Sequence, residues 1–278
     1  MDVMNFFESI FRWFHVFAGI IWIGMLYFFN WINGPFEAML DAETKKKVVP
    51  ELRPRALFWF RWGAAFTWVT GVLLLLMVYY HGRAAFTATS GWGIGAIIMV
   101  VLVFVSPFIY DALVNSLMKE LQAAFIGGVI LALVLLLLFQ YVGGFSVRGY
   151  AIHLGATFGT IMAFNVWFRI WPAQQKIITA IKEGNAPDAA LVGLAGLRSR
   201  HNTYMSVPAA ISSSRWRIAI RGLSRVQTAR NPSISQWLQV AYWRCVAASG
   251  SSAEVWTSQF STTSVLVFER TSGGTRSE

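Results

Sequence analysis

Cysteine and charge are both scarce in this sequence. It has 278 residues, and its one cysteine, Cys245, excludes an internal disulfide, a zinc site of the CxxC kind and covalent attachment of haem c through CxxCH. Only 13% of the residues are charged, whereas 56% belong to the hydrophobic set. A soluble domain of this length carries more charge, so the composition indicates an integral membrane protein.

Long apolar runs fill the first two thirds of the chain. A membrane-spanning helix needs about 20 mostly apolar residues, and five segments meet this need without the period-2 alternation of a barrel strand. The sequence therefore predicts an all-α fold, a polytopic transmembrane helix bundle with five full membrane helices and, as an option, an incomplete sixth. The five segments are Phe11–Ile32, Ala64–Tyr80, Ile94–Val114, Ala123–Tyr141 and Tyr150–Trp171.

Basic residues are distributed unevenly between the connections. Residues 33–63 hold six Lys or Arg, and the connection after the fifth helix holds four more, whereas the opposite side has only Arg12, Arg83 and Arg148. The positive-inside rule then places the N-terminus outside and the basic connections in the cytoplasm. We interpret the net charge of +10 as a solvated cytoplasmic face of a multi-pass protein in a lipid bilayer, and expect no nucleic-acid partner.

Residues 210–278 differ sharply from the rest of the chain. They contain 14 Ser and 8 Arg but no Lys, Asp, His or Met, and no apolar run among them reaches spanning length. We therefore divide the chain into a transmembrane domain, residues 1–209, and an atypical Ser/Arg-rich cytoplasmic tail, interpreted as disordered or peripheral. A second hypothesis derives the tail from a shift of reading frame, because the bias begins where His201–Pro208 opens a sixth helix.

Two histidines lie within predicted membrane helices. His15 comes four residues into the first helix and His153 three residues into the fifth, which puts both about 5–6 Å below the outer face. Ionisable groups inside a membrane are costly and mark ligands, proton paths or partners. Two neutral imidazoles at one level on separate helices suit axial ligation of a b-type haem. The structural alternative is a pair of interfacial histidines bonded to neighbours or head-groups.

Several other features of the predicted helices have a structural and a functional interpretation. Asp111 and Arg169 lie at the cytoplasmic ends of the third and fifth helices, where they form an ion pair or line a polar pocket. Gly155 and Gly159 follow His153. They leave room for a porphyrin or, more simply, let two helices pack closely.

The densest polar motif is RSRHNTYMSVP, Arg198–Pro208. Arg200, His201 and Asn202 are the candidate catalytic residues, because they offer hydrogen-bond donors and an imidazole that titrates near neutral pH. The alternative is a basic entry to a helix on the cytoplasmic side.

Three blocks of the sequence resemble a known family. They are similar to the N-terminal membrane domain of the bacterial membrane-bound urate oxidases, also called urate hydroxylases, of the PuuD type. The resemblance covers roughly residues 10–209. Its blocks are FHVFAGIIWIGMLYFFNWINGPF (Phe14–Phe36), PELRPRALFWFRWGAAFTWVTG (Pro50–Gly71) and RHNTYMSVP (Arg200–Pro208).

The resemblance implies an oxidoreductase of the bacterial inner membrane. Such an enzyme oxidises urate to 5-hydroxyisourate with water as the source of oxygen, and passes the electrons through haem b to a cytochrome c. On this interpretation His15 and His153 hold the haem iron. Arg200, His201 and Asn202 then serve the substrate, proton transfer or the fold.

Two departures from the family keep other functions open. Its members continue past MSVP with further membrane helices and a cytochrome c domain carrying CxxCH, and this sequence has neither. One alternative is therefore a truncated, non-catalytic membrane remnant. The His-first helix is also similar to the HemJ-type protoporphyrinogen oxidases, although PELRPRALFWFRW is not. A transporter is weaker still, because no inverted repeat is visible.

Overall fold

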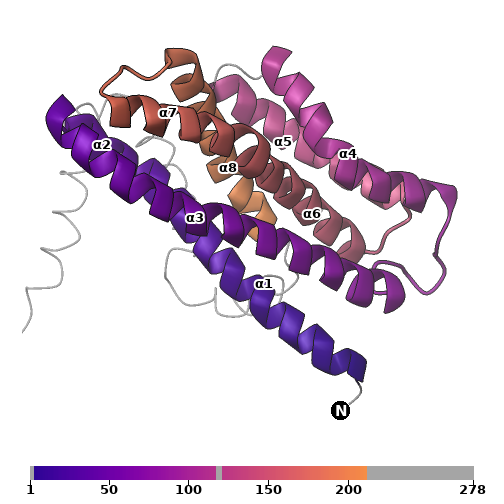
Figure 1. Ribbon diagram of the computed structural model, residues 1–278. Helices are drawn as coiled ribbons and strands as arrows, with labels where there is room; N and C mark the ends of the chain where they lie inside the picture. The colour runs from indigo at the N-terminus through magenta and orange to yellow at the C-terminus, as the bar shows by residue number, and fades with distance from the viewer. Residues whose placement is uncertain (1–2, 117–120, 212–278) are drawn as a thin grey trace, which may run out of the picture. The chain divides into compact units, whose positions relative to one another are not determined.

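The computed structural model describes residues 3–116 and 121–211 (Figure 1), which form helices and short connections. The predicted all-α fold is confirmed for this part of the chain. The tail from residue 212 onward lies outside the described residues, and so do both hypotheses about it. The α-helices are α1 (Val3–Tyr27), α2 (Gly34–Met39), α3 (Ala42–Leu74), α4 (Ile94–Ser116), α5 (Leu121–Leu137), α6 (Val147–Asn165), α7 (Trp171–Glu183) and α8 (Ala189–Ile211).

Four π-helical segments extend or join these helices. A π-helical turn bonds residue i to residue i+5 and widens the helix locally. Two of the segments make continuous rods, because they connect α1 to α2 and α6 to α7, and the other two prolong α3 and α5. The segments are η1 (Phe28–Asn33), η2 (Leu75–His81), η3 (Leu138–Val142) and η4 (Val166–Ile170).

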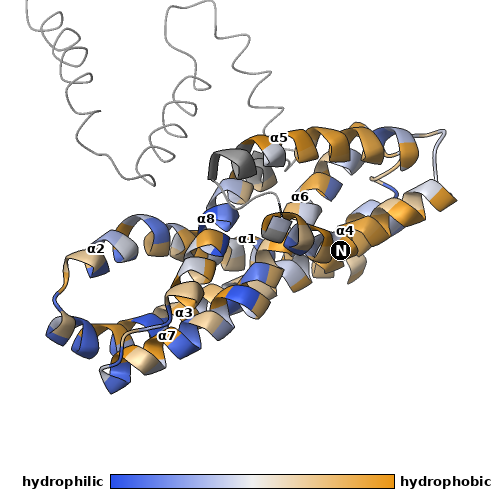
Figure 2. Cartoon of the chain, turned by 90° about the horizontal axis from the view of Figure 1, so that it is seen from above, coloured by the Kyte–Doolittle hydropathy of each residue, from blue (hydrophilic) through white to orange (hydrophobic). Residues whose placement is uncertain are grey.

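Within residues 3–116 and 121–211, four helical stretches are long and apolar enough to cross a membrane, by length and composition. They are Val3–Met39, Ala42–His81, Ile94–Val114 and Val147–Glu183. The fourth predicted span, Ala123–Tyr141, falls on α5 and η3, where the apolar helical stretch Ile126–Val142 is shorter than the other four. The four stretches indicate a multi-pass membrane protein, and the N-outside orientation stays a prediction. Figure 2 shows hydrophobic residues along α4 and α5, and polar residues gathered on α2, the start of α3 and α7.

Helix α3 begins much earlier than the apolar pattern predicts. We expected residues 33–63 to be a connection, but residues 42–63 belong to this helix of 33 residues. Asp41 caps its start by accepting hydrogen bonds from the backbone N–H and the hydroxyl of Thr44, and these bonds lower the pKa of Asp41. Pro50 and Pro54 lie inside the helix, where each removes one backbone donor. The prediction of a loop is therefore wrong for residues 42–63.

An ion pair ties this early part of α3 to its neighbours. Arg53 binds the carboxylate of Glu37 on α2 through Nε and Nη2 and donates from Nη1 to Gln174 on α7 at 3.0 Å. Asn33 adds a hydrogen bond of 2.9 Å to Glu37. Through these contacts Arg53, an arginine of the block PELRPR, joins α3 to α2 and α7.

Helices α1 and α3 cross closely at Gly63. A Cβ atom added to this glycine would lie 3.1 Å from the backbone nitrogen of Trp22 and 3.3 Å from the carbonyl oxygen of Ala18. A side chain at this position would press against the backbone of α1, so glycine suits the close approach. Helix α6 lies in the middle of the bundle, where α3, α4, α5 and α8 all contact it (Figure 1).

Candidate functional site: a buried polar face on α8

Helix α8 buries a set of polar side chains on one face. Arg198, His201 and Asn202 occupy positions i, i+3 and i+4, which lie on the same side of a helix. Their exposed fractions are 1%, 4% and 0%. Arg200, the arginine that we predicted at the site, is exposed, because it stands two positions from Arg198 and faces the other way. The structure therefore brings His201 and Asn202 together with Arg198 and not with Arg200.

Arg198 is held by an acidic partner on α4. Its Nη2 lies 2.6 Å from Oδ1 of Asp111, whose Oδ2 binds Nη2 of Arg169 at 2.5 Å. The predicted Asp111–Arg169 pair is thus confirmed, and Asp111 joins a second arginine to it. The guanidinium of Arg198 lies 5.2 Å from the ring centroid of Tyr110. Its Nε is buried and has no hydrogen-bond partner among the described residues.

His201 also keeps one ring nitrogen without a partner. Its Nδ1 shares a hydrogen bond of 2.8 Å with the hydroxyl of Tyr110, whereas Nε2 is buried and has no partner within the described part of the chain. Helix α8 is not one of the four candidate spans. Burial lowers the pKa of His201 to about 4, with further contributions from the charges of Arg198 and Arg200. The imidazole is therefore neutral near pH 7.

Asn202 fixes the position of α8 against α6. Its Oδ1 accepts a hydrogen bond of 2.9 Å from Nδ2 of Asn165, and its own Nδ2 donates to the carbonyl oxygen of Met162 at 3.0 Å. Asn165 is fully buried as well and accepts a long hydrogen bond, 3.5 Å, from Nη1 of Arg198. The cluster thus combines two positive charges, one carboxylate, two amides, a phenol and a neutral imidazole in the space between α4, α6 and α8.

His15 lies against α3, away from this cluster. Its Nδ1 is 2.9 Å from the carbonyl oxygen of Thr67 and 3.2 Å from the hydroxyl of Thr70. Because a carbonyl oxygen only accepts, Nδ1 carries the proton and Nε2 is the nitrogen with a lone pair. A Cβ at Gly71 would lie 3.0 Å from Cε1 of the imidazole, so the missing side chain makes room for the ring.

His153 is buried completely, on α6. Its Nδ1 donates to the carbonyl oxygen of Gly149 at 2.7 Å, and its Nε2 accepts from the hydroxyl of Tyr80 at 2.9 Å. The ring stacks on Phe145 with centroids 4.0 Å apart and an interplanar angle of 13°. Phe139 contacts it from another side, with centroids 5.5 Å apart. Both nitrogens and one ring face are therefore occupied by protein atoms.

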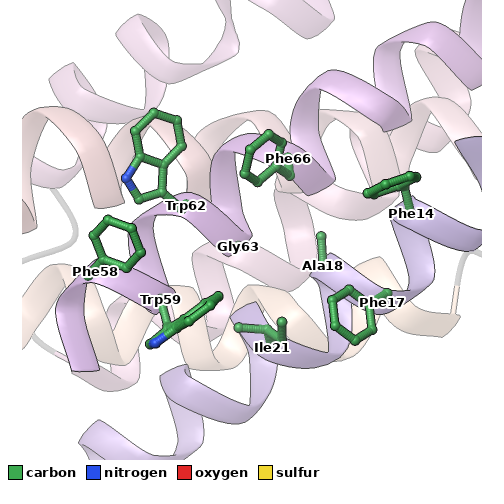
Figure 3. Close-up of a pocket in the computed structure, with 9 residues that line it drawn as sticks. All are labelled: Phe14, Phe17, Ala18, Ile21, Phe58, Trp59, Trp62, Gly63 and Phe66. Carbon is green, nitrogen blue, oxygen red and sulfur yellow. The ribbon is translucent and has the colours of Figure 1, made fainter. Parts of the chain in front are cut away.

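A groove lined by apolar surface lies between α1 and α3, on the outer side of their crossing (Figure 3). Figure 3 shows aromatic rings from both helices around Gly63, the residue at which the two backbones approach each other. Nine residues line it: Phe14, Phe17, Ala18 and Ile21 of α1, and Phe58, Trp59, Trp62, Gly63 and Phe66 of α3.

Comparison with known protein families identifies the domain. The family model described as urate oxidase N-terminal matches residues 1–214. The chain belongs to this family. No curated protein and no solved structure matches it. The match includes every helix described above, so the polar face of α8 and the histidines on α1 and α6 are all parts of a urate oxidase N-terminal domain.

Haem b is the cofactor that the resemblance to urate oxidases implies. Its two predicted ligands, His15 and His153, differ in how free their Nε2 atoms are to bind iron. A histidine that binds iron commonly donates its other N–H to a carbonyl, as His15 and His153 both do. A porphyrin on His153, however, has to displace Tyr80 from Nε2. The two histidines also bond to different heights of the same helical rod. His15 bonds to Thr70 on α3, and His153 bonds to Tyr80 on η2, ten residues further along. Ten residues correspond to about 15 Å at 1.5 Å per residue.

As the side chains stand, the two histidines therefore bond to protein groups at different heights along α3 and η2. Haem ligation by this pair stays a prediction. Among the described residues, no group of three or more His, Cys, Asp or Glu is placed to hold a metal ion.

Proposed function

We propose that this urate oxidase N-terminal domain oxidises urate to 5-hydroxyisourate in the membrane and passes the electrons to a cytochrome c. Family membership supports the substrate. The observation that carries the choice of site is the buried face of α8, where Nε of Arg198 and Nε2 of His201 have no partner among the described residues. A buried polar atom without a partner costs about 1–3 kcal/mol, and a bound polar ligand removes that cost.

The residues of this face match the chemistry that the reaction needs. Urate and water give 5-hydroxyisourate, two protons and two electrons, so the site requires donors for an electron-rich purine and a proton acceptor. Arg198 supplies positive charge through a guanidinium that Asp111 holds in place. If Nδ1 of His201 donates to the hydroxyl of Tyr110, Nε2 has the lone pair and accepts a proton from water or from urate.

In this proposal Arg200 has no role at the site, and Asn202 has the structural one of the roles that we predicted. Arg200 is exposed and does not contact urate in this proposal. Both polar ends of Asn202 are already bonded within α6, so Asn202 positions His201 and Arg198 and does not react itself. The electrons leave through a carrier, and when haem b is bound it supplies one-electron transfer towards the cytochrome.

Direct binding of urate tests the site. Equilibrium dialysis of labelled urate against the purified full chain in detergent should show saturable binding. His201→Ala should weaken it about tenfold or more, because a hydrogen bond in a buried site is lost. The matched control is Arg200→Ala, one residue away on the opposite face, which should leave the dissociation constant unchanged. Equal loss in both variants would exclude this face of α8, and no binding by the unaltered chain would support a non-catalytic remnant.

A further inference from the structure

Arg61 on α3 has no acidic partner within the described part of the chain. The two earlier arginines of the same helix each bind a glutamate, Arg53 with Glu37 and Arg55 with Glu51. Arg61 shows no ion pair and no side-chain hydrogen bond among the described residues, and its Nε is buried without a partner. A guanidinium has five donors, so this one retains its full capacity for an anion.

Aromatic rings hold the guanidinium of Arg61 in place. Its Cζ lies 3.9 Å from the ring centroid of Trp171, 5.7 Å from that of Trp167 and 6.0 Å from that of Phe58. Stacking on aromatic faces attracts the cation but leaves its N–H groups unused at the edge of the plane. Tryptophans gather at the level of lipid head-groups in membrane proteins, and we infer this level for Arg61 from the two tryptophan rings beside it.

The apolar groove between α1 and α3 begins beside this arginine. Phe58 belongs to both, since it contacts the guanidinium and lines the groove. The groove then continues along α3 through Trp62 to Phe66, roughly 12 Å at 1.5 Å per residue. Its wall carries large side chains that are about half exposed, such as Phe66 at 52% and Phe17 at 51%. In a membrane the neighbour of such a surface is a hydrocarbon chain.

We propose that Arg61 and the groove together bind one anionic phospholipid, with the phosphate on the guanidinium and an acyl chain along α1 and α3. The guanidinium fork matches the geometry of a phosphate. Preference for an anionic head-group over a zwitterionic one follows from the charge of Arg61, which has no acidic partner among the described residues, since a zwitterionic head-group brings a cation of its own. Lys45, Lys46 and Lys47 lie 14 to 16 residues earlier on the same helix, roughly 20 Å away at 1.5 Å per residue, and contribute only a long-range attraction for anionic lipids.

Native mass spectrometry of the full chain, released from detergent with equal amounts of phosphatidylglycerol and phosphatidylcholine of the same chain length, tests this site. We expect one phosphatidylglycerol to remain bound in preference to phosphatidylcholine. Arg61→Gln should reduce that adduct about tenfold or more, and Arg61→Lys should retain part of it. The matched control is Arg55→Gln, on the same helix but exposed and away from the groove, which should leave the adduct unchanged.

A second variant separates the groove from the charge. Ile21→Trp fills the groove, so it should weaken binding of long-chain phosphatidylglycerol and spare the dihexanoyl form, which has little chain to accommodate. Equal adducts in the unaltered chain and in Arg61→Gln would overturn the proposal, as would equal retention of the two head-groups. A lipid-free dimer that Ile21→Trp dissociates would assign the groove to a second copy of the chain instead.

Discussion

Asp111 on α4 holds Arg198 on α8 at 2.6 Å, and the arginine side chain is 1% exposed. The carboxylate is therefore what allows a full positive charge to stay inside the bundle, near Nε2 of His201, which has no partner among the described residues. The same carboxylate binds Arg169, which is 34% exposed. One acidic residue thus serves a buried arginine and a half-exposed one, and the two pairs should differ greatly in their effect on stability.

Replacing Asp111 should destabilise the protein strongly. Asp111→Asn leaves Arg198 charged and buried, and breaking a buried pair in this way costs about 3–5 kcal/mol. Arg169→Gln removes the partner that is closer to solvent and should cost about 1 kcal/mol or less. Thermal unfolding in detergent, followed by tryptophan fluorescence, compares the two variants. Similar melting temperatures for the two variants would show that Asp111 does not stabilise the buried charge of Arg198.

The close crossing of α1 and α3 should tolerate no side chain at Gly63. In Gly63→Ala the new methyl group meets backbone atoms of α1 at 3.1–3.3 Å, which must move apart at a cost of about 1–3 kcal/mol. Gly159→Ala on α6 is the matched control, because a Cβ there meets no described atom within 4 Å. That change should be neutral or stabilise by up to about 1 kcal/mol. A lower melting temperature for Gly159→Ala than for Gly63→Ala would contradict this assignment.

Tyr110 should affect the rate of urate oxidation more than the binding of urate. Its hydroxyl bonds Nδ1 of His201, so Tyr110→Phe leaves the ring orientation and the tautomer of the imidazole undefined. We expect kcat to fall roughly ten- to hundredfold while KM changes little, because the donors for urate remain. Steady-state kinetics in isolated membranes measure both constants. A change confined to KM would place Tyr110 in binding instead of proton transfer.

The haem prediction has a direct spectroscopic test. Membranes that contain the chain should give a reduced-minus-oxidised spectrum of the b type, which His15→Ala and His153→Ala should each abolish. Because Tyr80 occupies Nε2 of His153, Tyr80→Phe should keep or increase the signal. A full signal in both histidine variants would remove these two ligands, and loss of the signal in Tyr80→Phe alone would contradict the idea that Tyr80 competes with iron.

The sequence predicted the helices well where contact with lipid requires a continuous run of apolar residues. Continuous apolar runs must be helical, since a membrane leaves no other way to satisfy the backbone, and the ends of the third run, Ile94–Val114, agree with α4 to within two residues. The Asp111–Arg169 pair was predictable too, because both residues lie at the same end of their helices. Residues 42–63 were missed since their charges and prolines resemble those of a loop.

The choice between Arg198 and Arg200 depended on where α8 begins. With a helix opening only at His201–Pro208, the nearest arginine, Arg200, was the natural candidate. The helix begins at Ala189, so Arg198 is already helical. The residues three and four positions after it, His201 and Asn202, then lie on its face of the helix. Glycine spacing misled in a similar way. A Cβ added to Gly159, within a Gly-x-x-x-Gly pattern, would meet no described atom within 4 Å, whereas a Cβ added to Gly63, which has no such pattern, would lie 3.1 Å from the backbone nitrogen of Trp22.

Turnover of urate tests the central claim most directly. Membranes with the full chain, supplied with urate and oxidised cytochrome c, should consume urate and reduce two cytochromes for each 5-hydroxyisourate formed. The same membranes with His201→Ala should lose roughly two to four orders of magnitude in rate, and those with Arg200→Ala should keep theirs. Absence of urate consumption by the unaltered chain, with a cytochrome c present and the protein folded, would contradict the proposed function.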